Sequence, residues 1–353
     1  MSQSLSNFYR TNYTYKSIDL FAGLGGIRMG FEKVGFKTVF ANDFDKNSKI
    51  AYDLNFGDSS LTLQDLKTIE PEKLPDFDFL FGGFPCQAFS IAGYRKGFED
   101  SSGRGDLFFY IAKILETKEP QGFMLENVKN LVTHDNGKTF QIILNTLHEL
   151  GYYVKYQVLN TMEYGNLRQN RERIYIVGFK DPATLNRFQF PKKQFLTQKM
   201  DDILDKEIDA KYYYNDKPLY PSLKDGVLSF ETFYQWRRQY VRENKKNVCP
   251  TLTANMGTGG HNVPIVRDLK GIRKLTPREC FRLQGFPDSY KLPFMSDSGL
   301  YKLIGNSVSV NVIEQIAKQV HLALEPVSIE EFKKDRNLQA IFNLRLVQQE
   351  LVC

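Results

Sequence analysis

Short apolar segments alternate with amphipathic helical patterns through the first half of the chain, and this alternation restricts the possible folds more than any other feature. Strands are expected at the following positions: Ser17–Ala22, Lys37–Ala41, Phe77–Phe81, Phe123–Leu125 and Ile174–Val177. The clearest helix has Phe140, Ile143 and Leu147 on one face and ends before Gly151, a typical C-terminal cap. Strands interleaved with helices predict an α/β fold with a doubly wound, mostly parallel sheet and a ligand at the carboxyl ends of its strands.

The alternation stops near residue 185, which indicates a second, smaller and more irregular unit. Regular patterns return near residue 273, and Val308–Leu324 is expected to be a helix with one apolar stripe that packs back on the first domain. The expected division is a large domain over 1–185 completed by 300–325, an irregular domain over 186–299, and a C-terminal extension of unassigned role over 326–353.

Composition and cysteine spacing exclude several classes of protein. A hydrophobic fraction of 42% and a charged fraction of 25% are those of an ordinary soluble globular protein. No apolar run approaches the roughly 18 residues of a membrane span, and the N-terminus lacks the apolar core of a signal peptide. The isolated cysteines argue against a zinc site or a disulfide scaffold and suit a reducing cytoplasm; they are Cys86, Cys249, Cys280 and Cys353. The net charge of +6 is only a weak indication of a nucleic-acid partner.

The segment DLFAGLGG, residues 19–26, predicts a strand, a tight turn and a helix that bring the main chain close to a nucleotide-like ligand. It lacks the GxGxxG pattern of dinucleotide-binding proteins, because Arg28 occupies the third glycine position. Asp43 lies 24 positions after Asp19 at the end of the next strand, where an acidic residue commonly accepts hydrogen bonds from ribose hydroxyls. Because no lysine is placed to hold phosphates, S-adenosylmethionine fits this pattern better than ATP or NAD.

Cys86, in GGFPCQAFS, follows the third expected strand and is a candidate nucleophile. A lone cysteine is more often a core residue, but three other segments favour a reactive role. Glu126 ends the next strand and should therefore lie near Cys86 in a parallel sheet. The QNRER segment (169–173) places two arginines before a strand, and GNSV (305–308) enters the final helix. Taken singly, these segments are explained equally well by a surface acid, a solvated charged loop and a helix cap.

Six sequence blocks, in order along the chain, resemble those of the cytosine-C5 DNA methyltransferase family. They are DLFAGLGG, GGFPCQAFS with GFEDSSGRGDLFF, ENVKN, QNRERIY, RKLTPRECFRLQGFP and YKLIGNSVSVNV. They span nearly the whole chain except the middle of 186–272 and the tail. The resemblance implies the fold of S-adenosylmethionine-dependent methyltransferases, with a catalytic and cofactor-binding domain and a target-recognition domain. It also indicates a bacterial or phage enzyme of the restriction-modification type.

The resemblance implies four catalytic residues: Cys86, Glu126, Arg171 and Arg173. A Cys86 thiolate would add to C6 of cytosine and make C5 nucleophilic. Glu126 would assist at N3, for which its carboxyl needs a raised pKa. The two arginines would stabilise the carbonyl oxygen of the base and a nearby phosphate, and would favour the thiolate. Cys86 would leave after C5 has received the methyl group and lost its proton.

Carried over position by position, the cofactor site comprises Phe21, Leu24, Gly26, Asp43, Phe44, Asp65, Pro85, Leu107, Asn306 and Ser307. Phe44 replaces a tryptophan that is common in the family, and this change preserves stacking on adenine. Asp65 stands in LQDLK rather than in the family's usual Gly-Asp pair. Pro85 also rigidifies the turn that presents Cys86, and segment Gly93–Asp106 is expected to close over DNA.

A cytosine within a duplex must be flipped out before a thiol can reach C6, and segment 186–272 is expected to select that base. Its residues 234–260 mix arginines and lysines with aromatic side chains, a composition suited to phosphate and guanine contacts. The Thr251-Leu252 pair also resembles a dipeptide that recurs in the recognition regions of the family. The expected DNA contacts are Gln169, Arg237, Arg238, Arg242 and Thr251.

Three alternatives remain open on the sequence. A tRNA cytosine-C5 methyltransferase would share the catalytic motifs, although the long basic and aromatic insert favours DNA. A catalytically silent relative that binds nucleic acid would not need Cys86, Glu126 and the glycine turn together, and Arg28 disfavours a nucleotide-binding oxidoreductase. The expected partners are double-stranded DNA and, acting separately, a cognate restriction endonuclease. We expect a cytoplasmic monomer that binds neither metal nor membrane.

Overall fold

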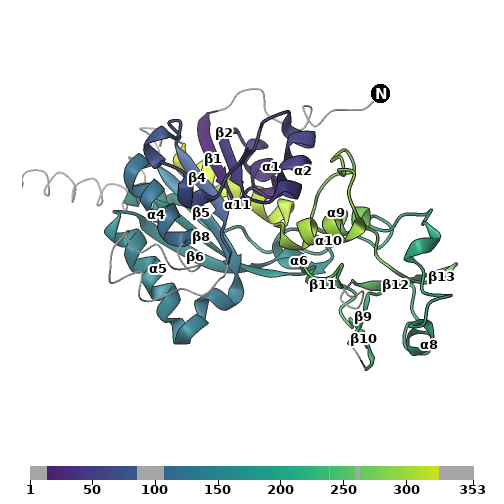
Figure 1. Ribbon diagram of the computed structural model, residues 1–353. Coiled ribbons are helices and arrows are strands. Elements are labelled where there is room, and N and C mark those ends of the chain that lie inside the picture. The colour runs from purple at the N-terminus through teal and green to yellow at the C-terminus, as the bar shows by residue number, and fades with distance from the viewer. Residues whose placement is uncertain (1–13, 86–106, 238, 259–262, 326–353) are drawn as a thin grey trace, which may run out of the picture.

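A computed structural model describes residues 14–85, 107–237, 239–258 and 263–325 of the chain. At its centre lies a seven-stranded sheet in the order β3-β2-β1-β4-β5-β8-β6 (Figure 1). These strands are, in that order, Thr62–Leu63, Phe36–Asp43, Tyr15–Leu20, Phe79–Gly83, Gly122–Val128, Glu172–Phe179 and Tyr153–Asn160. Neighbours from β3 to β5 are parallel, whereas β8 runs antiparallel to β5 and β6. The expected mostly parallel sheet is confirmed.

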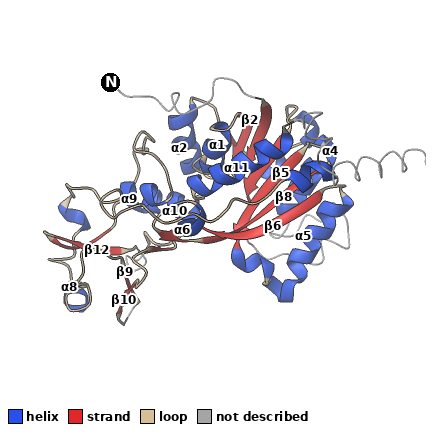
Figure 2. Cartoon of the chain, turned by 180° about the vertical axis from the view of Figure 1, so that it is seen from behind, coloured by secondary structure: helices blue, strands red, loops and turns tan. Residues whose placement is uncertain are grey.

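Helices cover both faces of this sheet, as a doubly wound fold requires (Figure 2). They include α1 (Gly26–Glu32), α2 (Lys46–Phe56), α4 (Leu107–Lys118), α5 (Lys138–Glu149), α6 (Thr161–Tyr164), α7 (Pro182–Arg187) and α11 (Val310–Leu324). Because strand residues alternate between faces, Leu80 of β4 enters the core beneath α4 and α5, while Phe79 and Phe81 pack with α1 and α11. None of the helices in the described ranges has the length and apolar character of a membrane span.

Local sequence patterns place most of these elements correctly. Gly151 follows α5 with a φ of 78°, the left-handed geometry of a helix stop, and its amide donates to the His148 carbonyl at 2.9 Å. The final helix buries its expected apolar stripe, Val312, Ile313, Ile316 and Val320. Strand β6 was not expected, because it lies at the edge of the sheet and exposes Tyr153 and Tyr156.

Most of the chain between α7 and α11 forms a smaller lobe beside the sheet, built from short strands and loops (Figure 1). Its four-stranded sheet has the order β10-β9-β12-β13. These strands are Val241–Glu243, Tyr234–Trp236, Ile265–Asp268 and Gly271–Lys274, and the helices that follow are α9 (Pro277–Leu283) and α10 (Asp297–Asn306). The lobe is not separate from the large domain, because one hydrophobic core contains Leu24 and Met29 together with Cys249, Leu275 and Phe281.

A buried ion network fixes α9 on the small sheet. The two carboxylate oxygens of Glu279 accept from Nη1 and Nη2 of Arg273, both at 2.9 Å, and the Arg273 Nε lies 2.6 Å from Asp268. Glu279 also closes a capping box at the start of α9 by accepting from the Thr276 amide. Both Arg273 and Glu279 are fully buried, so water solvates neither charge.

Replacing Glu279 with alanine should lower the free energy of unfolding by about 3–5 kcal/mol, because it leaves the Arg273 guanidinium buried without its main partner. Urea denaturation measures this loss. Glu70→Ala is the matched control, because Glu70 pairs with Lys73 at 2.8 Å where both side chains are exposed. Equal losses in the two variants would contradict this account.

Candidate active site

A cavity of about 520 Å³ lies at the carboxyl ends of β1, β2, β4 and β5, where the α/β pattern places a ligand. The turn after β1 and the end of α10 complete its walls. Most of the residues expected in the catalytic and cofactor sites line it: Phe21, Leu24, Gly26, Asp43, Phe44, Pro85, Leu107, Glu126, Arg171, Arg173, Asn306 and Ser307. The structure thus brings together residues that lie up to 286 positions apart in the sequence (307 − 21).

The glycine turn between β1 and α1 owes its shape to left-handed main chain. Gly25 has a φ of 74°, and a β-carbon there would lie 2.3 Å from the Phe56 ring, so only glycine fits. The Asp43 carboxylate holds this turn against the end of β2, because it accepts from the amides of Gly23 at 2.9 Å and Asp45 at 2.8 Å. Burial raises the pKa of Asp43, whereas these amide hydrogen bonds lower it.

Phe44 presents its ring at the cavity, and 72% of its surface is exposed. Such a large apolar side chain, left open beside buried polar groups, is suited to stacking on a flat ring. Asp65 does not join it: its exposed side chain accepts from the Lys67 amide at 3.0 Å, and the residue is absent from the cavity wall. The assignment of Asp65 to the cofactor site is therefore not supported, because its carboxylate caps a short turn instead.

Glu126 and Arg173 face each other at the catalytic end of the cavity. The Arg173 Nε lies 3.1 Å from Glu126 Oε1, an ion pair without the alignment of a hydrogen bond, and Oε1 has no hydrogen-bond partner among the described residues. Burial raises the pKa of the Glu126 carboxyl, and the charges of Arg173 and Arg171 lower it. The net direction is upward, as the sequence analysis required.

Parallel pairing brings the cysteine segment to this carboxyl. Gly83 of β4 is the partner of Glu126 in β5, and Pro85 lies two residues further on in the cavity wall. The Asn127 side chain, missed by the sequence analysis although ENVKN contains it, donates to the Phe84 carbonyl at 2.9 Å and steadies this turn. Cys86 itself, with the expected closing segment Gly93–Asp106, lies outside the described residues.

Arg171 makes main-chain contacts that the sequence analysis did not predict. It is buried, and its terminal nitrogens donate to the carbonyls of Leu252 (2.9 Å), Gly305 (3.4 Å) and Ser307. Burial, with the neighbouring Arg173 charge, lowers its pKa to about 9. Both terminal nitrogens of the guanidinium are thus engaged by main chain, whereas its buried Nε has no hydrogen-bond partner among the described residues. Arg171 lines the catalytic cavity and also connects that cavity to the small lobe.

Gln169 likewise does not face DNA. It is fully buried, donates to the Leu283 carbonyl at 3.0 Å and accepts from the Leu252 amide at 3.1 Å. It lies in β7 (Gln169–Asn170), which pairs in parallel with β11 (Cys249–Pro250). The expected DNA contact at Gln169 is therefore wrong, because both ends of its amide serve this junction between lobes.

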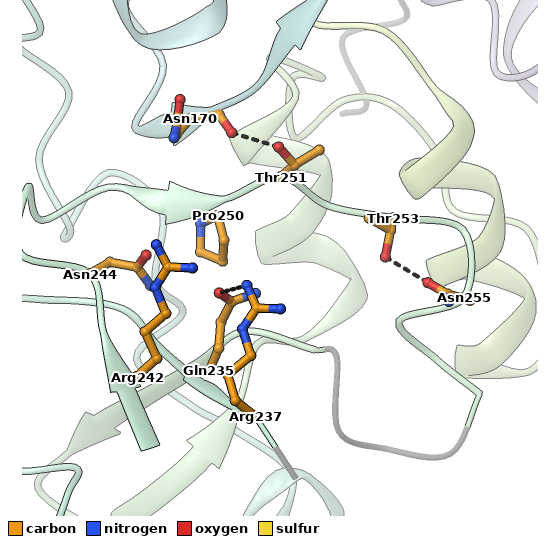
Figure 3. A pocket seen from close by; sticks show the side chains of 9 residues that line it. All are labelled: Asn170, Gln235, Arg237, Arg242, Asn244, Pro250, Thr251, Thr253 and Asn255. Carbon is orange, nitrogen blue, oxygen red and sulfur yellow. Dashed lines mark hydrogen bonds between the residues drawn. The ribbon is translucent and has the colours of Figure 1, made fainter. Parts of the chain in front are cut away.

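A second cavity, of about 410 Å³, lies on the small lobe beside this junction (Figure 3). Its wall contains three of the expected DNA contacts, Arg237, Arg242 and Thr251. Thr251 donates its hydroxyl to the Asn170 carbonyl at 2.7 Å. The remaining expected contact, Arg238, lies outside the described residues.

Comparisons with known proteins agree with this arrangement. Residues 15–321 match the sequence profile of the family described as C-5 cytosine-specific DNA methylase. The chain is 54% identical over 310 residues to the Type II methyltransferase M.Bsp6I of Bacillus sp. (strain RFL6), covering 86% of this chain and 98% of that one. It is 39% identical over 325 residues to the Type II methyltransferase M.HhaI of Haemophilus parahaemolyticus, covering 87% and 94%.

Solved structures share the fold at lower identity. The S. pombe Dnmt2 methyltransferase superposes with a TM-score of 0.67 at 19% identity, covering 89% of this chain and 99% of that one. The Entamoeba histolytica methyltransferase EhMeth gives a TM-score of 0.68 at 20% identity, covering 90% and 100%. The fold and the sequence profile together confirm the resemblance inferred from the six blocks. The chain belongs to the family of C-5 cytosine-specific DNA methylases and is a DNA cytosine-5-methyltransferase.

Replacing Arg171 with methionine should lower the free energy of unfolding by about 3 kcal/mol, because buried carbonyls then lose a charged donor. Thermal and urea unfolding measure the loss. Arg168→Met is the control: Arg168 also donates to two carbonyls, of Gln198 and Asn247, but it is only partly buried. A stable Arg171 variant that lacks activity would instead favour direct contact with the substrate.

Proposed function

We propose that this enzyme transfers the methyl group of S-adenosylmethionine to C5 of a flipped-out cytosine within a short specific sequence of double-stranded DNA. The observation that carries the proposal is the buried Glu126 carboxyl, facing Arg173 and directly across from the strand that leads to Cys86. Its Oε1, which has no hydrogen-bond partner among the described residues, is suited to a ring nitrogen of the base. The Type II methyltransferases among the relatives support a modification enzyme, with a cognate endonuclease acting separately.

The first cavity suits S-adenosylmethionine. A volume of about 520 Å³ is in the range of cofactor sites. The exposed Phe44 ring would stack on adenine, and the Asp43 carboxylate, whose oxygens each retain a lone pair, would accept from the ribose hydroxyls. The bound cofactor supplies an electrophilic methyl group on a sulfonium centre. Leu107 and Asn306, also in the wall, would complete the enclosure.

The chain's own residues would then activate the base. The Cys86 thiolate forms a bond to C6, and the displaced electron pair moves toward N3, where the protonated Glu126 donates its proton. The resulting enamine carries nucleophilic density at C5, where it would accept the methyl group that the bound cofactor supplies. Loss of the C5 proton to a base then re-forms the C5–C6 double bond, breaks the C6–sulfur bond and releases the thiolate, and N3 returns its proton to the Glu126 carboxylate.

Burial favours the protonated form of the Glu126 carboxyl, which this step requires. Because desolvation raises the pKa of the carboxyl, a larger fraction is protonated near neutral pH than for an exposed glutamate. Arg173 limits this effect and, once Glu126 is neutral, its guanidinium is free to bind the carbonyl oxygen of the base. Flipping the base costs a few kcal/mol, which contacts from the small lobe would offset.

Labelled methyl transfer from S-adenosylmethionine tests the proposed function. Wild type should label duplex DNA and yield 5-methylcytosine, whereas Cys86→Ala should lose all transfer and still bind DNA, since the proposed DNA contacts lie elsewhere. Label in tRNA alone would overturn the substrate. Label in neither nucleic acid, with DNA and cofactor still bound, would favour a catalytically silent relative.

Glu126→Gln should lower the rate of methyl transfer by about 10²–10⁴-fold, because an amide cannot pass a proton to N3 as a carboxyl does. Affinities for DNA and cofactor should stay unchanged, as measured by equilibrium binding. A variant with near wild-type turnover would remove Glu126 from the mechanism.

Phe44→Ala should weaken cofactor affinity on the order of tenfold, the usual worth of one aromatic stacking partner. Phe44→Trp is the matched control, because it keeps a flat ring and should bind as wild type does. Isothermal titration with S-adenosylhomocysteine measures both. Equal affinity in all three proteins would show that the exposed ring does not touch the cofactor.

A further inference from the structure

The β9–β10 hairpin divides its side chains between two chemically different faces. Tyr234, Trp236 and Val241 turn toward the core of the small lobe. The side chains that alternate with them along the two strands all line the second cavity: Gln235, Arg237, Arg242 and Asn244. The register explains this division, because Arg242 pairs with Gln235 across the hairpin and strand residues two apart share a face. The hairpin thus presents a continuous polar and cationic face to the cavity.

The two arginines on this face differ in their side-chain hydrogen bonds. Arg237 Nη2 donates to the Gln235 carbonyl oxygen at 3.2 Å, which orients its guanidinium. The Arg242 side chain is exposed and makes no hydrogen bond or ion pair with any residue that the structure describes. Figure 3 shows the Arg242 and Arg237 side chains on either side of Gln235, both extending toward the strand that carries Pro250. Among the described residues that line the cavity, Arg242 is therefore the one with a complete donor fork free.

The other polar groups of the cavity favour one base over the rest. Reading adenine takes both ends of one side-chain amide. Here the Gln235 carbonyl accepts from Arg237, and the Asn244 amino group donates to the Phe233 carbonyl at 3.0 Å. Asn170 and Asn255 likewise each accept one hydrogen bond, so all four amides already have one end in use within the protein, although each carbonyl keeps a second lone pair. No carboxylate lines the cavity to accept from the amino group of cytosine. Guanine, with two acceptors at O6 and N7, matches the free arginine fork.

The cavity is joined rigidly to the catalytic site. Pro250 of β11 pairs with Asn170 of β7, and the next residue along, Arg171, donates to the Leu252 carbonyl. Arg173, which faces Glu126, follows two positions later. A base held against Arg242 is therefore tied by a short stretch of paired main chain to the residues that act on the target cytosine.

We propose that Arg242 reads a guanine of the recognition sequence in the major groove, through paired hydrogen bonds to O6 and N7. The hydrogen-bonded Gln235 and Arg237 side chains form the adjacent wall of the cavity. This inference rests on the proposed function and deepens it, because it names the base that the enzyme requires near its target. Lys245 and Lys246, exposed in the turn that follows the hairpin, lie outside the cavity wall and suit phosphates instead.

The test begins by mapping 5-methylcytosine in plasmid DNA methylated by wild type, which gives the recognition sequence. Duplexes are then made with 7-deazaguanine at each guanine of that sequence in turn, which removes N7 and keeps Watson–Crick pairing. For wild type, kcat/KM should fall on the order of tenfold at one guanine. Arg242→Ala should methylate the unmodified duplex more slowly and lose this sensitivity. Arg242→Lys should behave similarly, because lysine keeps the charge without the fork.

Lys245→Ala is the matched control, and it should weaken methylation of all duplexes alike while keeping the sensitivity to 7-deazaguanine. Unfolding temperature and cofactor affinity should be unchanged in the Arg242 variants, since the exposed side chain makes no hydrogen bond or ion pair with a described residue. Wild-type sensitivity in Arg242→Ala would overturn the inference alone, as would a uniform loss with weaker salt dependence, the mark of a phosphate contact. Absence of 5-methylcytosine with wild type would overturn the proposed function and this inference with it.

Discussion

The buried guanidinium of Arg171 is the contact on which the arrangement of the site depends. This guanidinium donates to the carbonyl of Leu252 in the small lobe and to that of Ser307 after α10. Two residues after Arg171 in the chain, Arg173 forms an ion pair with Glu126. A buried charge that loses its acceptors carries a large desolvation cost, so these segments cannot separate cheaply. Gln169 and the β7–β11 pairing reinforce the junction. The surface proposed to meet DNA is thereby held in a fixed relation to the proposed catalytic residues.

The same burial that stabilises this junction also sets the chemistry beside it. Desolvation raises the pKa of Glu126, while the neighbouring arginines lower it. An acid buried with an opposite charge close by can hold or release a proton with a small change in its surroundings. Entry of a base next to Oε1 would be such a change, because it brings an acceptor to an atom that lacks a hydrogen-bond partner among the described residues.

The sequence predicted those parts of the fold and site that depend on local patterns. The glycine turn, Asp43 and Glu126 end strands or follow them directly, so parallel order alone brought them to one edge of the sheet. The roles of Gln169 and Arg171 were not predictable in this way, because Leu252, their common partner, lies more than 80 positions further along the chain. The assignment of Asp65 to the cofactor site is unsupported for a different reason: the carboxylate accepts from the Lys67 amide in its own turn. The cationic face of the hairpin likewise required the register of β9 and β10, which no local pattern in an irregular segment supplies.

The most direct test of the account is to trap the bond between Cys86 and the base, using a duplex whose target cytosine is replaced by 5-fluorocytosine. Elimination of the thiol requires C5 to lose a proton. Fluorine at C5 cannot leave as a cation in the way that hydrogen does, so the thiol stays bound to C6 once C5 is methylated. With S-adenosylmethionine present, intact mass should show one enzyme joined to one DNA strand, peptide mapping should place the bond at Cys86, and Cys86→Ser should form none. Methylation of ordinary DNA without any adduct on the fluorinated duplex, or an adduct at the buried Cys249 or Cys280, would contradict the account.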